Sequence, residues 1–525
     1  MICLSCTGKT IEENLEYIER YRKYLGIVEI RADFLRPSEL DRLPEFPGKA
    51  GLPVILTYRK LEDGGSSSGS GASSDGGASS DSGASIDSGA SIDGGASSDS
   101  GAAVEFSEIR RSDILMHGLC GGYRYIDIED DADEEYALPL IAEAEKTGTA
   151  VIRSFHDFSG VPDCLFDRMI AASDGGRFIP KAAVMPKSTA DLISIIKTSR
   201  KLTDSVEGKA AAEQGFILLG MGVYGFPTRV LAKALGSMLT FCSPSGAQAA
   251  PGHVSPDQLA EVYGYSGISR GSRVYGILGH PVMHSQSPLI HNGGYRSLGI
   301  DAVYLPFETT EPELFIRNAE LLNLGGLSVT IPHKQRVIPL ADRVDESVRT
   351  IGACNTLVNC GRDEGWKAYN TDWIGFLAPL AGLPLSGKEA LVIGAGGAAR
   401  AVVYALTKSG MKVTVINRTA EKAERLAADF LCSGGGLSAA ERPDKPWLVV
   451  QTTSVGMSPD TAGDPLPGFD FSGTEVVYDL IYTPEKTTFL MQAEAAGCRI
   501  INGHHMLTAQ AAEQFLLFTG CKASF

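Results

Sequence analysis

Residues 391–419 read LVIGAGGAARAVVYALTKSGMKVTVINRT, and this stretch decides the fold of the C-terminal half of the chain. The apolar run 391–393 predicts a strand, the glycines after it predict a tight turn, and the Ala-rich segment that follows predicts a helix. A second β-branched run, 413–416, predicts the next strand. Strand, glycine turn, helix and strand form the βαβ unit that holds a dinucleotide pyrophosphate at a helix N-terminus. The residues of the predicted turn are Gly394, Ala395, Gly396, Gly397 and Ala398.

The end of the second strand indicates which dinucleotide binds. An NAD site usually carries Asp or Glu at this point, about 20 residues after the glycines, to bind the ribose 2′-hydroxyl. This chain has Asn417, Arg418 and Thr419 there, and its next acidic residue is Glu421. A guanidinium followed by a hydroxyl suits a 2′-phosphate. The sequence therefore predicts NADP as the cofactor, with an ordinary surface arginine as the alternative interpretation.

The composition is that of a globular protein with more than one domain. The 525 residues can form two or more cores, with 43% hydrophobic and 21% charged residues. A formal net charge of −16 argues against nucleic acid or an anionic membrane as a partner and leaves small-molecule substrates. No apolar run reaches the ~20 residues of a transmembrane helix, and the first residues do not resemble a secretory signal. Ten scattered cysteines, including a lone pair at Cys3 and Cys6, predict reduced thiols in the cytoplasm rather than a metal site.

Residues 1–253 alternate short apolar runs with helical stretches. Eight such runs predict a (β/α)8 barrel, in which catalytic groups lie at the carboxyl ends of the strands. The predicted strands are 2–6, 27–34, 54–59, 125–130, 150–155, 178–185, 216–221 and 239–242. Polar residues gather at these strand ends, namely Glu29, Arg31, Arg59, Asp127, Glu129, His156, Lys181 and Arg229.

Residues 64–103, between the third and fourth predicted strands, follow neither a helical nor a strand pattern. From Gly71 the segment repeats a hexapeptide five times, as GASSDG, GASSDS, GASIDS, GASIDG and GASSDS. A hexapeptide period can indicate a β-helix, but these units hold too few apolar side chains to build a core. The sequence predicts a disordered Gly/Ser/Ala/Asp insert in the barrel.

The remaining chain predicts a second α/β part. Residues 254–271 are typical of a last helix and a linker, and a new α/β pattern begins at Val274. We expect residues 272–525 to form the second part of the protein. Within it, residues 272–376 and the C-terminal helices would bind substrate, and residues 388–505 would form a Rossmann domain for NADP.

The barrel carries residues suited to Schiff-base chemistry. Lys181 lies in a mostly apolar predicted strand, where loss of solvation would favour a neutral, nucleophilic amine. His156 could transfer protons near neutral pH, and Glu129 could orient its imidazole ring. The alternative for Lys181 is a side chain that only extends to the barrel rim. Guanidinium groups for an acidic substrate come from Arg31, Arg59 and Arg229.

The second half carries residues suited to reduction of a ketone. Lys334 ends the predicted strand in VTIPHK, and Asp372 follows Tyr369-Asn370-Thr371. A Lys–Asp pair can supply the proton that the developing alkoxide requires. Each of these residues, taken alone, could have a purely structural role. Their joint presence beside a nucleotide-binding fold favours a role in catalysis or substrate binding. Hydroxyl and amide groups for a polyhydroxylated acid come from Ser285, Ser287, Thr330 and Asn355.

These motifs resemble two enzyme families. Residues 274–525 resemble shikimate dehydrogenase through HSQSP, SVTIPHK, GACNTLV, YNTDWIG, GAGGAAR, NRT, TTSVGM, YDLIYTP and MLTAQAA. Residues 1–253 resemble type I 3-dehydroquinate dehydratase through EIRADFL, TYR, IDIED, SFHDF, KAAVMP, GMGVYGFPTR and APG. The resemblance implies a bifunctional enzyme of the shikimate pathway. It would dehydrate 3-dehydroquinate to 3-dehydroshikimate and reduce this product to shikimate with NADPH.

The resemblance also implies residue roles. In the barrel, Lys181 would be the Schiff-base lysine and His156 the general acid/base, with Glu129 assisting. Substrate contacts would come from Ser5, Glu29, Arg31, Arg59 and Arg229. In the dehydrogenase, Lys334 and Asp372 would be the catalytic pair. Shikimate contacts would come from Ser285, Ser287, Thr330, Asn355, Tyr482 and Gln510. Cofactor contacts would come from the turn 394–398, Asn417, Arg418, Thr419 and Gly503.

The chain departs from these families at two places. Its predicted substrate loop in the barrel reads Ala249-Ala250-Pro251-Gly252-His253, where the dehydratase family has Ser-Ala-Pro-Gly-Gln. The lost hydroxyl and amide leave open a barrel that supports the dehydrogenase without catalysing a reaction. Ser328 stands where single-function dehydrogenases often have Asn. A quinate/shikimate dehydrogenase that uses NAD is the other alternative.

Overall fold

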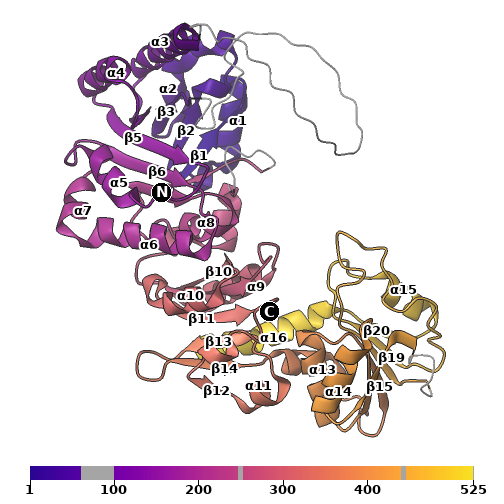
Figure 1. Cartoon of the computed structure of the whole chain (residues 1–525). Helices are drawn as coiled ribbons and strands as arrows, with labels where there is room; N and C mark the ends of the chain where they lie inside the picture. The colour runs from indigo at the N-terminus through magenta and orange to yellow at the C-terminus, as the bar shows by residue number, and fades with distance from the viewer. Residues whose placement is uncertain (61–99, 246–251, 253, 439–444, 524–525) are drawn as a thin grey trace, which may run out of the picture. The chain divides into compact units, whose positions relative to one another are not determined.

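The computed structural model describes residues 1–60, 100–245, 252, 254–438 and 445–523. These form two compact units, Met1–Lys187 with Ser194–Glu261 and Ser188–Ile193 with Val262–Phe525 (Figure 1). Residues 64–99 of the predicted insert, and the loop residues Ala249 and His253, lie outside the described residues. Within the described ranges, no helix is both long enough and apolar enough to cross a membrane.

The first unit contains an eight-stranded parallel sheet in the order β7-β6-β5-β4-β3-β2-β1-β8, surrounded by helices (Figure 1). Its strands are rich in Ile, Val and Leu, because a parallel strand is covered on both faces. Right-handed crossovers bring all eight carboxyl ends to one edge. The predicted (β/α)8 barrel is therefore confirmed. The strands are β1 (Ile2–Cys6), β2 (Ile27–Arg31), β3 (Val54–Thr57), β4 (Tyr125–Glu129), β5 (Ala150–Asp157), β6 (Ile179–Val184), β7 (Ile217–Gly220) and β8 (Thr240–Cys242).

Local signals position the helices between these strands. Thr10 caps α1 (Ile11–Tyr21) by accepting the Glu13 N–H at 3.1 Å. Gly148 ends α4 (Glu134–Thr147) in the left-handed conformation, with φ of 71°. The other helices are α2 (Phe46–Ala50), α3 (Ser100–Leu119), α5 (Leu165–Ser173), α6 (Thr189–Asp204), α7 (Val206–Ala211) and α8 (Gly222–Val230).

Several predicted boundaries in the barrel differ from the structure, among them those of β2, β5 and α3. Strand β2 stops at Arg31, because a 3-10 turn (Ala32–Phe34) follows it directly. Strand β5 continues to Asp157 and therefore includes His156, since its pairing with β6 extends that far. Helix α3 begins at Ser100, so residues 100–103, predicted as the end of the insert, are helical.

The second unit contains two six-stranded sheets. The first has the order β10-β9-β11-β13-β14-β12, in which β13 runs antiparallel to both of its neighbours. Its strands are β9 (Arg273–Gly279), β10 (Ala302–Glu308), β11 (Leu324–Val329), β12 (Arg343–Val344), β13 (Thr356–Asn359) and β14 (Trp366–Tyr369). The helices of this part are α9 (Ser287–Leu298), α10 (Pro312–Arg317), α11 (Glu346–Ile351) and α12 (Asp372–Leu377).

The other sheet confirms the predicted Rossmann fold. All its pairs are parallel, in the order β17-β16-β15-β18-β19-β20. The chain order reverses at β15, with β16 on one side and β18 on the other, and this point of a doubly wound sheet forms a ligand crevice. The strands are β15 (Glu389–Ile393), β16 (Lys412–Ile416), β17 (Ser433–Gly435), β18 (Leu448–Gln451), β19 (Val476–Asp479) and β20 (Arg499–Ile501). The helices are α13 (Gly397–Lys408), α14 (Ala420–Asp429) and α15 (Thr488–Ala495).

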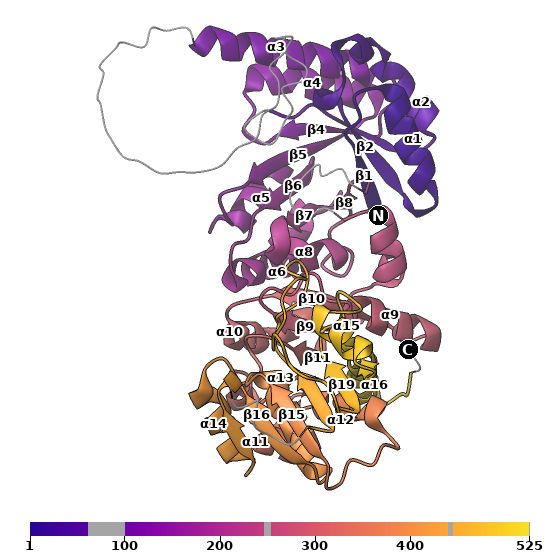
Figure 2. The same ribbon diagram turned by 90° about the vertical axis from the view of Figure 1, so that its right-hand side faces the viewer.

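The last helix, α16 (Gly503–Thr519), contributes to both cores of the second unit. It packs on α12 and α9 and is the yellow helix labelled α16 in Figure 2. Met506 belongs to the apolar core of the Rossmann sheet. Phe515 and Phe518 pack with Tyr275 and neighbouring aromatic rings in the core of the first sheet. This helix therefore ties the substrate part to the nucleotide part.

A close backbone approach in the barrel gives a test of the fold. A Cβ added to Gly225 in α8 would lie 2.3 Å from the carbonyl carbon of Gly220 at the end of β7. Backbone atoms cannot rotate away as a side chain can, so we expect Gly225→Ala to lower the free energy of unfolding by about 2–3 kcal/mol. Gly160→Ala is the matched control, since its Cβ would meet no atom within 4 Å. Equal stability of the two variants in denaturant titrations would contradict the close packing.

Candidate active sites

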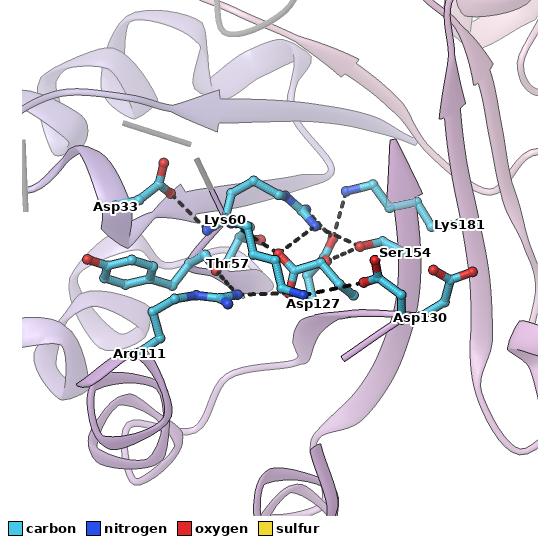
Figure 3. A network of polar contacts seen from close by, with 12 residues as sticks. Asp33, Thr57, Lys60, Arg111, Asp127, Asp130, Ser154 and Lys181 are labelled. Carbon is cyan, nitrogen blue, oxygen red and sulfur yellow. Dashed lines mark hydrogen bonds and ion pairs between the residues drawn. The ribbon is translucent and has the colours of Figure 1, made fainter. Parts of the chain in front are cut away.

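Buried charged side chains fill the carboxyl end of the barrel (Figure 3). They come from β2, β4 and β6 and from the residues just beyond β3, and each is at most 4% exposed: Glu29, Arg59, Asp127, Glu129 and Lys181. A charge removed from water needs an opposite charge and hydrogen bonds close by. Arg111 from α3, which is 5% exposed, completes the set by pairing with Glu129. Three cations and three carboxylates thus form one connected group in which every charge has a partner.

Lys181 occupies the centre of this group. Its Nζ donates to Asp127 Oδ2 at 2.7 Å and lies 3.7 Å from Glu29 Oε1. Successive side chains of a strand point to opposite faces. Ala182 and Val184 of β6 pack in an apolar core cluster on one face, whereas Lys181 lies on the other face. The expectation of apolar surroundings is corrected accordingly: carboxylates contact the Lys181 side chain.

Asp127 is the residue with a role that the sequence reasoning missed. Its Oδ1 accepts from Ser154 Oγ at 2.5 Å, and its Oδ2 also lies 2.9 Å from the Arg59 guanidinium. Burial alone would raise the pKa of Asp127, but Arg59 and Lys181 together hold that pKa well below its usual range. Asp127 is therefore ionised. The sequence feature that could have identified Asp127 is its position two residues before Glu129, which places both side chains on one face of β4.

Glu129 and His156 form no hydrogen bond with each other in the part of the chain that the structure describes. Glu129 was expected to orient His156, but its carboxylate accepts from Arg111 at 2.8 Å and lies 3.6 Å from Arg59. His156 Nδ1 is buried and has no hydrogen-bond partner among the described residues. Burial, then Arg59 and Lys181, hold the pKa of His156 well below its usual range. The imidazole is thus neutral at pH 7 and able to accept a proton.

Three predicted substrate contacts of the barrel form hydrogen bonds with neighbouring side chains, namely Ser5, Glu29 and Arg31. Ser5 Oγ donates to Glu29 Oε2 at 2.8 Å, and Thr57 Oγ1 donates to the other oxygen at 3.0 Å. Arg31 forms a bidentate pair with Asp33, at 2.9 and 2.8 Å. These contacts hold Glu29 and Arg31 in fixed positions at the strand ends.

Arg229 differs from the other barrel cations. It is 2% exposed, and its guanidinium donates to the Phe241 carbonyl at 3.3 Å. Its Nε has no partner within the part of the chain that the structure describes. Burial lowers the pKa of Arg229 to about 10, so it remains a cation at pH 7. Unused donors on a buried cation suit an anionic substrate group.

The second unit contains another Lys–Asp pair. Lys334 follows β11, Asp372 begins α12, and Lys334 Nζ donates to Asp372 Oδ2 at 2.5 Å. Asn355 Nδ2 donates to the other oxygen of Asp372 at 2.7 Å, and Asn355 Oδ1 accepts the Thr371 N–H at 2.8 Å. Because both carboxylate oxygens are held, Asp372 fixes the position of the Lys334 ammonium.

A cavity of about 900 Å³ joins this pair to the glycine turn. Its volume lies within the usual range of ligand sites. Its lining includes the Lys–Asp pair, several hydroxyl groups and the N-terminus of α13. The predicted residues that line it are Ser285, Ser287, Thr330, Lys334, Asn355, Asp372, Ala395, Gly396, Gly397, Ala398, Tyr482, Gly503 and Gln510.

Four predicted cofactor residues are not among those that line the cavity, namely Gly394, Asn417, Arg418 and Thr419. Gly394 has φ of 111°, and a Cβ on it would lie 2.4 Å from Thr452 Oγ1, so it allows the tight turn. Two cations of α14, Lys422 and Arg425, line the cavity instead. Their spacing of three residues on a predicted helix was the signal that could have identified them.

The substrate part also contains a buried polar network behind its hydroxyl groups. Ser328, noted above as a departure, donates to Gln514 Oε1 at 2.8 Å and accepts from Tyr304 OH at 2.6 Å. Gln514 Nε2 in turn donates to the Asn355 carbonyl at 3.2 Å. Gln514 of α16 thus connects Ser328 to Asn355, the residue that holds Asp372.

Family models match both halves of the chain. The model of type I 3-dehydroquinase matches residues 2–77 and 92–270. The model of the shikimate dehydrogenase substrate binding domain matches residues 277–357. The model of shikimate / quinate 5-dehydrogenase matches residues 379–435.

Curated relatives agree with these matches. A bifunctional 3-dehydroquinate dehydratase/shikimate dehydrogenase of Arabidopsis thaliana is 29% identical, over 100% of this chain and 82% of the relative. The shikimate dehydrogenase (NADP(+)) of Moorella thermoacetica is 42% identical, over 49% of this chain and 91% of the relative. The shikimate dehydrogenase (NADP(+)) of Oleidesulfovibrio alaskensis is 45% identical, over 48% of this chain and 92% of the relative. The chain therefore belongs to the shikimate dehydrogenase family through its second half, and carries a type I 3-dehydroquinase domain in its first half.

Proposed function

We propose that the chain catalyses two consecutive reactions. The barrel removes water from 3-dehydroquinate to give 3-dehydroshikimate, and the second unit reduces this ketone to shikimate with NADPH. The observation that carries the proposal is that each half holds a lysine fixed by an aspartate, Lys181 with Asp127 and Lys334 with Asp372. The name of the Arabidopsis thaliana relative combines the same two activities.

In the barrel, Lys181 would act as a nucleophile. Its amine attacks the ketone carbon, the carbonyl oxygen leaves as water, and an iminium links substrate to Nζ. The iminium withdraws electrons from the neighbouring carbon, so the neutral His156 can remove a proton there. The hydroxyl one carbon further leaves as water after protonation. A water molecule then hydrolyses the iminium, which releases product and restores the amine. Arg229 would bind the substrate carboxylate with its unused donors.

In the second unit, the chain fits a dinucleotide and a polyhydroxylated acid. The Gly396–Gly397 backbone lines the cavity at the N-terminus of α13, where a pyrophosphate is favoured. NADPH, when bound, supplies a hydride to the ketone carbon. Lys334 donates a proton to the oxygen of that ketone, and Asp372 keeps the ammonium in place. Ser285, Ser287 and Thr330 would bind the substrate hydroxyls.

Two alternatives are less well supported. The family model over residues 379–435 covers both shikimate and quinate enzymes, but two of the relatives described above are named as NADP(+) enzymes, and β16 ends without an acidic residue. A barrel without activity would not need a neutral His156 close to Lys181. The Arabidopsis thaliana relative is named as chloroplastic, so a cytoplasmic location stays a prediction from the cysteines.

The nucleophile can be identified by trapping. Borohydride added with 3-dehydroquinate should reduce the iminium to a secondary amine, and peptide mass spectrometry should locate the adduct on Lys181. Lys181→Ala should abolish both the adduct and the dehydratase activity. Shikimate oxidation is the internal control and should be unchanged, because its site lies in the other unit. An adduct on another lysine would contradict the assignment.

The proton donor of the reduction can be tested by kinetics. We expect Lys334→Ala to lower kcat for shikimate oxidation by roughly 10²–10⁴-fold, the usual contribution of a positioned acid or base. The effect should be larger on kcat than on KM, because the proton moves in the transition state. Dehydratase activity in the same chain serves as the control. An unchanged kcat would leave Lys334 with a structural role only.

Cofactor choice can be tested at two cations that follow strand β16, Arg418 and Lys422. Arg418→Ala and Lys422→Ala should each raise KM for NADP by roughly 10–100-fold, the value of one charge-assisted hydrogen bond. KM for NAD should change little, because NAD lacks the 2′-phosphate. Lys412→Ala removes an exposed cation at the opposite end of β16 and is the matched control. Equal weakening of both cofactors would show that these cations do not select NADP.

A further inference from the structure

We propose that Asp127 is a positioning residue of the dehydratase reaction, whose carboxylate holds Lys181 Nζ and compensates its positive charge before and after the iminium forms. The inference rests on the proposed Schiff-base function of the barrel and adds a residue to it. Asp127 is 1% exposed and donates no proton in the proposed steps. It acts through Lys181, which it contacts directly (Figure 3).

The contacts of Asp127 make it a rigid anchor. Oδ2 is shared by Lys181 Nζ at 2.7 Å and Arg59 at 2.9 Å, while Oδ1 accepts from Ser154 Oγ at 2.5 Å. Ser154 Oγ also accepts from Arg59 at 2.7 Å, which closes a ring of contacts around the carboxylate. A carboxylate held from both oxygens cannot turn away from Lys181. The amine is thereby directed to one point at the barrel centre.

The charge balance of imine formation explains why a fixed carboxylate suits this lysine. The overall step converts an ammonium and a ketone into an iminium and water, so one positive charge is present on nitrogen at the start and at the end. The neutral amine exists only in between, when its proton has moved to a base such as His156. A carboxylate at 2.7 Å therefore stabilises both the resting lysine and the covalent intermediate. Without Asp127, both the resting lysine and the iminium would leave a buried positive charge without its partner.

Other groups around Lys181 do not replace Asp127. Glu29 is farther, at 3.7 Å, and its two oxygens already accept from Ser5 and Thr57. The ring centroid of Phe241 lies 4.4 Å from Nζ, which adds a weaker attraction for the cation. The titratable groups that face Lys181 come from five strands of the barrel, namely Cys3 of β1, Glu29 of β2, Arg59 beyond β3, Asp127 of β4 and His156 of β5.

The test compares variants of the full chain by borohydride trapping and by steady-state kinetics. Asp127→Asn keeps the shape of the side chain and removes its charge. We expect the rate of adduct formation and the dehydratase kcat to fall by roughly 10²-fold, with KM changed by less than about threefold. Asp127→Glu, which restores the charge, should regain about tenfold of the loss. A residue needed only for folding would lower the amount of folded barrel without this split between kcat and KM.

Asp130→Asn is the matched control. Asp130 directly follows β4 but pairs with Arg168, at 2.7 Å for each of two bonds, rather than with Lys181. Its replacement should leave adduct formation and kcat at the wild-type values. Shikimate oxidation should be the same in all variants and reports the concentration of intact chain.

The outcomes separate this inference from the proposed function. No adduct in the wild-type chain would overturn the Schiff-base function itself. A wild-type adduct that forms equally fast in Asp127→Asn would overturn only the role of Asp127. If Asp127→Asn does not fold, the comparison is made in an Arg59→Met background, which removes the second buried cation. Adduct formation at saturating substrate should then be slower in the double variant than in Arg59→Met alone, and equal rates would overturn the inference.

Discussion

The ion pair between Lys181 and Asp127 is the constraint on which the barrel site depends. A buried lysine side chain needs an opposite charge close by, and Asp127 supplies it for Lys181, which is 4% exposed. Asp127 is in turn held by Arg59 and Ser154. The pairing continues through Glu129 to Arg111 on α3, so that neutralising one member would leave another buried charge without a partner. Such a network acts as a unit, and its geometry is stiffer than that of any single pair.

The two candidate catalytic lysines differ in a way that matches two kinds of chemistry. The side chain of Lys181 is 5% exposed and enclosed by carboxylates and an aromatic ring, which suits a covalent intermediate shielded from water. The side chain of Lys334 is 17% exposed and faces an open cavity of about 900 Å³, which suits delivery of a proton to a ketone beside a dinucleotide. In both sites an aspartate fixes the lysine side chain. The difference in solvent exposure is what distinguishes a covalent role for Lys181 from proton donation by Lys334.

Parallel strands explain the positions of the barrel site and of the glycine turn. In the barrel and in the Rossmann sheet, crossover helices bring the carboxyl ends of the strands to one edge, and polar side chains can collect there without disturbing the apolar core. The second unit adds a helix, α16, whose Met506 packs in one core and whose Phe515 packs in another. Its Gln514 also hydrogen-bonds to Ser328 and Asn355, so the substrate groups are positioned by the same helix that joins the cores.

Local patterns in the chain were sufficient to predict the eight barrel strands, the Rossmann βαβ unit, and lysines 181 and 334 as candidate catalytic groups, because strand burial and glycine turns depend on residues close in sequence. They did not identify the partners of these residues. Asp127 lies 54 positions from Lys181, and Gln514 lies 186 positions from Ser328. Glu129 was assigned to His156 but contacts Arg111, and Lys422 with Arg425 line the cavity where Arg418 does not. Which side chains meet depends on strand register, barrel closure and helix packing, and these are properties of the folded chain as a whole.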